Sequence, residues 1–116
     1  MLFRSEYIGH SEKKTLEAIE KADGGVLFID EAYALDDRYS SGHKGYGAEA
    51  TDVLVKQMED RRDRLVVIVA GYSAPMEGFL ATNLGLRSRI PVHLTFPDYS
   101  DDELVEIAEQ IGRAHV

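Results

Sequence analysis

Two short segments of the chain are apolar without the alternation expected of a half-buried strand. They are residues 26–29, Val-Leu-Phe-Ile, and residues 65–70, Leu-Val-Val-Ile-Val-Ala. Unbroken apolar runs of this length are typical of strands that are buried on both faces of a parallel sheet. The pattern predicts a third strand at residues 92–96.

Helical patterns alternate with these strands. Apolar residues at helical spacing follow Ser11, which can cap a helix, and they continue to the Asp-Gly-Gly turn at residues 23–25. Three later helices are predicted: one after the Asp-, Ser- and Gly-rich loop of residues 36–47, a short one at residues 75–81, and one at the capping-box pair Ser100 and Glu103. Strands that alternate with helices predict an α/β fold with a parallel sheet.

The composition narrows the class of protein further. A chain of 116 residues is long enough for one domain, and 13 Lys and Arg against 21 Asp and Glu give a net charge of −8. This acidic balance argues against a nucleic-acid-binding surface. The longest aliphatic run is too short to span a bilayer, so we expect no membrane insertion. The chain has no Cys and shows no signal peptide, so we expect a cytoplasmic protein.

The two ends of the chain are set aside from the fold prediction. Residues 1–5 and 111–116 resemble peptides that arise when sequencing adapters are read as coding sequence, so we expect the domain to occupy residues 6–110. The alternative is that residues 111–116 continue the last helix, which the apolar Ile111 would permit.

The first candidate for chemistry is a pair of carboxylates. Asp30 and Glu31 directly follow an apolar strand, and ligands of open parallel sheets bind beyond the carboxyl ends of the strands. One carboxylate there can coordinate the Mg²⁺ that accompanies a nucleotide, and the next can orient water for attack on phosphorus. The alternative is that both residues cap the helix that starts near Ala32, and the pair alone does not decide between the two.

The second candidate is a pair of cations before the third strand. A loop that holds Asn83 and Gly85 is expected to lead to Arg87 and Arg89. A permanently charged guanidinium suits the charge that develops on a transferring phosphoryl group. The alternative is that both arginines form surface ion pairs in an acidic chain.

Five segments, in this order and spacing, resemble the AAA+ ATPases, in the subgroup of red-type Rubisco activase, sporulation stage V protein K and type VII secretion ATPases. The segments are residues 6–9 (EYIG), 24–33 (GGVLFIDEAY), 70–72 (AGY), 85–89 (GLRSR) and 96–99 (FPDY). The resemblance implies a partial three-layer α/β/α P-loop NTPase core, and it implies ATP and Mg²⁺ as cofactors of the complete protein.

The same resemblance assigns roles to the candidate residues. It implies that Asp30 lies near the Mg²⁺ and that Glu31 polarises the hydrolytic water, as a Walker B pair. Arg89 is the first candidate for the arginine that reaches the neighbouring subunit's nucleotide, because Ser-Arg fits the family pattern, and Arg87 is the second.

Two further segments resemble pore loops of ring-shaped remodelling proteins. Tyr7, Ile8 and Gly9 have the aromatic, aliphatic and glycine order of a first pore loop, and residues 42–47 are interpreted as a second one. An aromatic wedge can grip varied polypeptide segments with little loss of rotamer entropy. The alternative for Tyr7 is an incidental aromatic in a frayed end.

Several parts of the family pattern do not occur in this sequence. There is no Gly-x-x-x-x-Gly-Lys-Ser/Thr segment and no lid with a second sensor arginine, and the polar sensor expected near residues 71–73 is not identifiable. The central strand before the P-loop is therefore missing, between the strands at residues 92–96 and 65–70. We expect residues 26–30 and 65–70 still to pair in parallel and residues 92–96 to be displaced.

The sequence as a whole predicts part of an AAA+ ATPase that remodels or threads protein substrates in a homo-oligomeric ring, with six subunits as the expected number. The complete protein would hydrolyse ATP, whereas the isolated chain is predicted to be inactive. The alternative is a non-catalytic interaction module on the same scaffold. A DNA-acting ATPase is disfavoured by the acidic balance and by Tyr7, Ile8 and Gly9.

Overall fold

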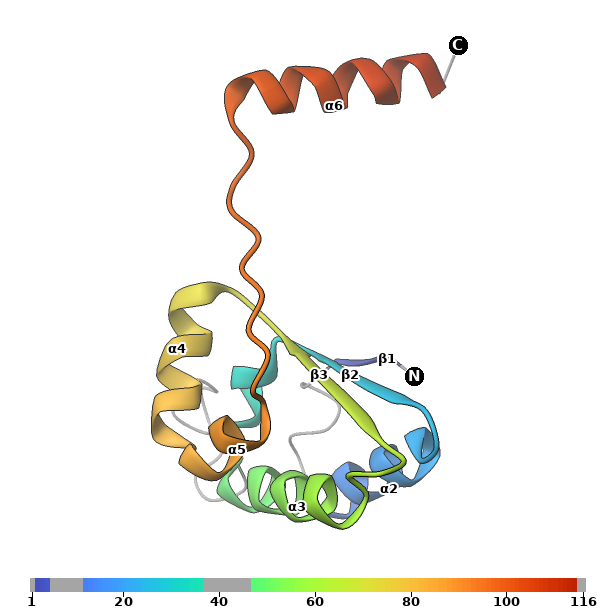
Figure 1. Ribbon diagram of the computed structural model, residues 1–116, viewed down its shortest axis with the longest axis vertical. Coiled ribbons are helices and arrows are strands. Elements are labelled where there is room, and N and C mark those ends of the chain that lie inside the picture. The colour runs from blue at the N-terminus through green and yellow to red at the C-terminus, as the bar shows by residue number, and fades with distance from the viewer. Residues whose placement is uncertain (1, 5–11, 37–46, 115–116) are drawn as a thin grey trace.

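The computed structural model describes residues 2–4, 12–36 and 47–114. In chain order the elements are β1 (Leu2–Arg4), α2 (Glu12–Ala22), β2 (Val26–Asp30), the 3₁₀ turn η1 (Ala32–Leu35), α3 (Gly47–Asp60), β3 (Val66–Ala70), α4 (Ser73–Thr82), α5 (Leu84–Arg89) and α6 (Asp101–Ala114). Strands alternate with helices as the apolar pattern predicts, and the fold is α/β (Figure 1).

The three strands form one parallel sheet in the order β1-β2-β3. The predicted parallel pairing of β2 with β3 is confirmed, with Val26 opposite Val66 and Asp30 opposite Ala70. β1 lies within residues 1–5, which the sequence prediction leaves outside the domain, and its Arg4 is paired in register with Asp30. The carboxyl ends of all three strands therefore meet at one edge of the sheet.

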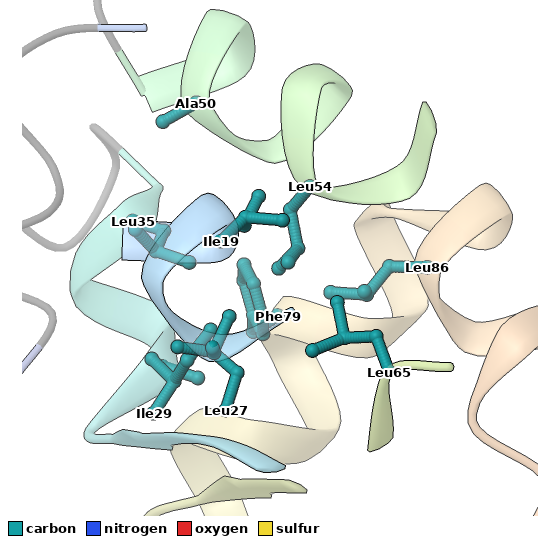
Figure 2. Close-up of a cluster of buried hydrophobic side chains, with 11 residues drawn as sticks. Ile19, Leu27, Ile29, Leu35, Ala50, Leu54, Leu65, Phe79 and Leu86 are labelled. Carbon is teal, nitrogen blue, oxygen red and sulfur yellow. The ribbon is translucent and has the colours of Figure 1, made fainter. Parts of the chain in front are cut away.

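Helices pack on one face of this sheet and enclose the core. The central side chains of the core are drawn in Figure 2 and include Leu27 and Ile29 from β2, Ile19 from α2, Leu54 from α3 and Phe79 from α4. Because side chains alternate along a strand, the neighbours of Leu27 and Ile29 point to the other face.

The opposite face of the sheet is open to solvent in the described part of the chain. Val66 and Ile68 on β3 are 56% and 45% exposed. The prediction that the two strands are buried on both faces is wrong for β3 and for the start of β2, where Val26 is exposed, because no described helix covers this side.

The strand expected at residues 92–96 does not form, which corrects the third-strand prediction. Residues 91–100 have no regular secondary structure, and Val92, Leu94 and Phe96 are 71%, 78% and 88% exposed. The physical reason is that no strand of the described sheet lies beside this segment, so its backbone groups have no partner with which to form a ladder. The displacement expected for residues 92–96 is therefore found.

The last helix begins where the capping-box signature places it. The Glu103 amide donates to Ser100 Oγ at 3.3 Å, and the Ser100 amide donates to Glu103 Oε2 at 3.4 Å. α6 continues past Ile111 to Ala114. Figure 1 shows α6 separated from the sheet and the other helices, and the radius of gyration of 16.8 Å exceeds the roughly 13 Å of a compact chain of this length.

Candidate functional site: the strand-end carboxylates and the arginine helix

The carboxylate pair lies at the carboxyl edge of the sheet, where β2 ends. Asp30 is the last residue of β2, and Glu31 adopts the left-handed conformation with φ 52° and ψ 49°. It is the one non-glycine residue with positive φ in the described part of the chain. Such a conformation costs on the order of 1–3 kcal/mol and persists only where surrounding contacts fix it, often at functional sites.

Two hydrogen bonds stabilise the turn at Glu31. The Glu31 amide donates to Asp30 Oδ1 at 3.0 Å, and the Glu31 carbonyl accepts from the Ala34 amide at 2.9 Å. Glu31 occupies the N-cap position of η1, yet its side chain makes no capping hydrogen bond. The capping alternative for Glu31 therefore has no hydrogen bond to support it.

A close contact with β3 restricts the same turn, and sequence reasoning did not identify it. A Cβ atom on Gly71 would lie 2.5 Å from Tyr33 Cε1 and 3.0 Å from the Met76 side chain, which no side chain tolerates without displacement of its neighbours. Only glycine fits here, and the Tyr33 ring packs directly on the backbone at the end of β3. The available sequence signal was a glycine immediately after an apolar strand.

The arginines lie on a helix rather than after a loop, which corrects the expected loop at Asn83 and Gly85. Asn83 joins α4 to α5, and Gly85 lies within α5. Leu86 is completely buried in the core, and this packing keeps the short segment helical.

The two arginines differ in how they are held. Arg89 Nη1 donates to the Gly85 carbonyl at 2.9 Å, and its Nε lies 3.5 Å from Glu59 Oε2 of α3. Arg87 is exposed and forms no ion pair with the described residues. The structure therefore supports the ion-pair alternative for Arg89 and leaves the guanidinium of Arg87 exposed.

The structure does not bring the arginines together with the carboxylates. Among the described residues, no hydrogen bond or ion pair joins Arg87 or Arg89 to Asp30 or Glu31. The first pore-loop candidates Tyr7, Ile8 and Gly9, and most of the second candidate segment at residues 42–47, lie outside the described residues.

The chemistry of the strand end fits a Mg²⁺ ion that is shared with a nucleotide. Mg²⁺ prefers oxygen ligands and is commonly held by one or two carboxylates together with phosphates and water. Asp30 offers a carboxylate at the sheet edge, and the described residues contain no group of three or more acidic, His or Cys side chains that would bind a metal alone. The sequence has no phosphate-cradling loop of its own.

Comparison with known proteins establishes the family. Residues 1–98 match the ATPase family associated with various cellular activities (AAA), and the chain belongs to this family. The chain is 51% identical to stage V sporulation protein K of Bacillus subtilis over 106 residues, which is 91% of this chain and 32% of that protein.

Two other relatives show similar identity. Protein CbbX of Cereibacter sphaeroides is 54% identical over 103 residues, 89% of this chain and 33% of that protein. The ESX-1 secretion system protein EccA1 of Mycobacterium tuberculosis is 51% identical over 112 residues, 97% of this chain and 20% of that protein. The chain thus spans about a third or less of the length of these relatives. None of the described helices has the length and apolar character needed to cross a membrane.

Proposed function

We propose that this chain works as part of a longer AAA ATPase that couples ATP hydrolysis to the remodelling or threading of protein substrates. The observation that carries the proposal is the carboxylate pair at the end of β2, with Glu31 held in the left-handed conformation beside Asp30. Family membership and the parallel sheet support the same function. We place the protein in the cytoplasm, in line with a chain that has no Cys.

In this mechanism each carboxylate has one task. Asp30 would hold the Mg²⁺ of the nucleotide, and Glu31 would orient water and accept its proton as the water attacks phosphorus. Mg²⁺, when bound, neutralises the negative charge of the phosphates. The left-handed turn supports these separate roles of Asp30 and Glu31. Because η1 begins directly after Glu31, the Glu31 side chain stays exposed at the edge of the sheet.

An arginine of α5 acts on the nucleotide of the neighbouring subunit in a homo-oligomeric ring. Arg89 remains the first candidate by its Ser-Arg pattern, and it would have to leave Glu59, a partly exposed pair in which the buried Arg89 Nε lies 3.5 Å from Glu59 Oε2 without a hydrogen bond. Arg87 is the second candidate, and its exposed side chain needs no such release. Tyr7, Ile8 and Gly9 are proposed to contact the protein substrate.

The substitution Glu31→Gln in the longer protein tests the proposal. We expect ATP binding to persist while hydrolysis slows by orders of magnitude, because the amide cannot accept the proton of water. Glu17→Gln, which removes one exposed carboxylate on α2, is the matched control and should hydrolyse ATP at the original rate. Steady-state hydrolysis and nucleotide binding are measured in parallel, and normal hydrolysis by Glu31→Gln would show that the assignment is wrong.

A further inference from the structure

Asn83 connects the two helices that lead to the arginines. Its amide donates to the Leu80 carbonyl at 3.3 Å at the end of α4, and its carbonyl accepts from the Arg87 amide at 3.0 Å in the first turn of α5. The backbone of Asn83 is thus bonded directly to one of the candidate arginines. Any rotation at Asn83 changes the direction of α5.

The side chain of Asn83 reaches the element that carries Glu31. Asn83 Nδ2 donates to Asp36 Oδ2 at 3.4 Å, across 47 positions of the sequence. Asp36 is buried and immediately follows η1, and its amide donates to the Tyr33 carbonyl at 3.0 Å. A continuous set of contacts therefore runs from the Glu31 turn, through η1 and Asp36, to Asn83 and α5.

The Asn83 side chain serves the end of α4 and also reaches a distant element. Asn83 stands at the N-cap position of α5 but makes no side-chain capping hydrogen bond. Asn83 Nδ2 also donates to the Phe79 carbonyl at 2.8 Å, but the Thr82 hydroxyl donates to the same carbonyl at 3.1 Å. Of the hydrogen bonds that Asn83 Nδ2 donates, the one to Asp36 is the one that links the α4–α5 junction to the end of η1.

We propose that Asn83 is a positioning residue that fixes α5, and hence its arginines, relative to the Glu31 turn through its hydrogen bond to Asp36. The inference rests on the proposed function. A subunit in which this bond is broken keeps its own Asp30 and Glu31 but presents its arginines wrongly to the neighbouring subunit.

The test uses Asn83→Ala in the longer protein, with Thr82→Val as the matched control. Thr82→Val removes a hydroxyl that bonds the Gly78 and Phe79 carbonyls but does not touch Asp36. We expect Asn83→Ala to lower kcat at least tenfold with the KM for ATP changed less than twofold, and Thr82→Val to hydrolyse normally. Amide exchange should accelerate in α5 of Asn83→Ala while the first turns of α4 stay protected.

Mixed rings separate a positioning role from a general loss of structure. Subunits with Asn83→Ala are mixed with subunits that carry Glu31→Gln, which are inactive themselves but keep an intact α5. We expect partial activity to return, because each Asn83→Ala site that lies beside the arginine of a Glu31→Gln subunit then receives a correctly placed arginine. Absence of recovery at every mixing ratio would show a merely structural role and overturn the inference.

A second variant covers the case in which Asn83→Ala does not assemble. Asn83→Asp keeps a residue type that favours helix N-caps, but it places a second carboxylate against that of Asp36. Because the two negative charges repel each other, we expect kcat to fall at least as far as in Asn83→Ala. Asp36→Ala should give the same loss, and the double variant Asp36→Ala/Asn83→Ala should be no worse than either single one. If the Asn83 variants have normal kcat while Glu31→Gln is inactive, the positioning role of Asn83 is wrong and the proposed function stands. If Glu31→Gln is active, the proposed function itself is wrong.

Discussion

Gly71 shows how a single residue without a side chain can position the candidate site. Its backbone lies against Tyr33 and Met76, so the turn after β3 and the 3₁₀ turn after β2 are in direct contact. We predict that Gly71→Ala destabilises the protein by about 1–3 kcal/mol, because the added methyl group overpacks this contact. Urea-induced unfolding followed by circular dichroism measures the change.

Gly85→Ala is the matched control for that substitution. A Cβ at Gly85 would meet Val55 Cγ1 at 3.6 Å, an ordinary contact, and alanine favours a helix by up to about 1 kcal/mol over glycine. Gly85→Ala should therefore be neutral or stabilising. Equal effects of the two substitutions would contradict the close contact at Gly71.

The positions of Asp30 and Glu31 could be predicted from the sequence, but their conformation could not. An apolar run that ends in two acids places them at a strand end, whatever the rest of the fold does. The left-handed turn at Glu31 and the pairing of Arg89 with Glu59 depend on contacts between residues distant in the chain, which local patterns do not contain. The roles of Asp30, Glu31, Arg87, Arg89 and the residues 7–9 remain predictions.

At the scale of elements, an ion-pair cluster ties the turn after α2 to the turn before β3. Asp23 Oδ1 lies 3.2 Å from Arg61 Nη1 and 2.9 Å from Arg64 Nε. Desolvation raises the pKa of the Asp23 carboxyl, but hydrogen bonds and charges from Arg64 and Arg61 outweigh it and lower that pKa below its ordinary value. The ionised form of Asp23 is therefore favoured by folding.

This cluster predicts a pH dependence with a definite sign. Because the pKa of Asp23 is lowered in the folded state, the ionised side chain adds to the free energy of unfolding. This stabilisation is complete above the ordinary aspartate pKa of about 3.9, and it disappears as pH falls through the lower pKa of the folded state. Asp23→Asn should thus reduce the urea midpoint near pH 6 and have little effect at the acid end. Asp63→Asn, an exposed neighbour without an ion pair among the described residues, should leave the midpoint unchanged at both pH values.

The sequence predicts most elements correctly; it does not predict β1, it predicts a strand at residues 92–96 that does not form, and it misses α5 for an identifiable reason. Asn83 and Gly85 are residues of turns, so their local preference indicated a loop. Burial of Leu86 against the core outweighs that preference and keeps residues 84–89 helical. The helices after Ser11, after the 36–47 loop and at Ser100 have clear apolar or capping signals, and the structure confirms them as α2, α3 and α6. The short helix predicted at residues 75–81 is confirmed as α4.

At the scale of the whole molecule, two apolar surfaces lack partners in the described part of the chain. One is the open face of the sheet, with Val66 and Ile68, and the other is the alternating set of Val92, Leu94 and Phe96. Within the described residues, the open face has no helix packed over it, and residues 92–96 have no neighbouring strand with which to pair. The outer edge of β3 also offers unpaired backbone groups, a known cause of association between chains.

We therefore predict that the isolated 116-residue chain self-associates at micromolar concentrations and shows no amide-exchange protection at residues 92–96. Val66→Lys/Ile68→Lys should shift sedimentation toward the monomer, because charges on the exposed face oppose stacking and edge pairing. Ala81→Lys, at an exposed position in the last turn of α4, adds a charge away from the sheet and should not change association. A monomeric chain with a sharp unfolding transition and strong protection at residues 92–96 would show that these residues have a stable partner within the chain itself.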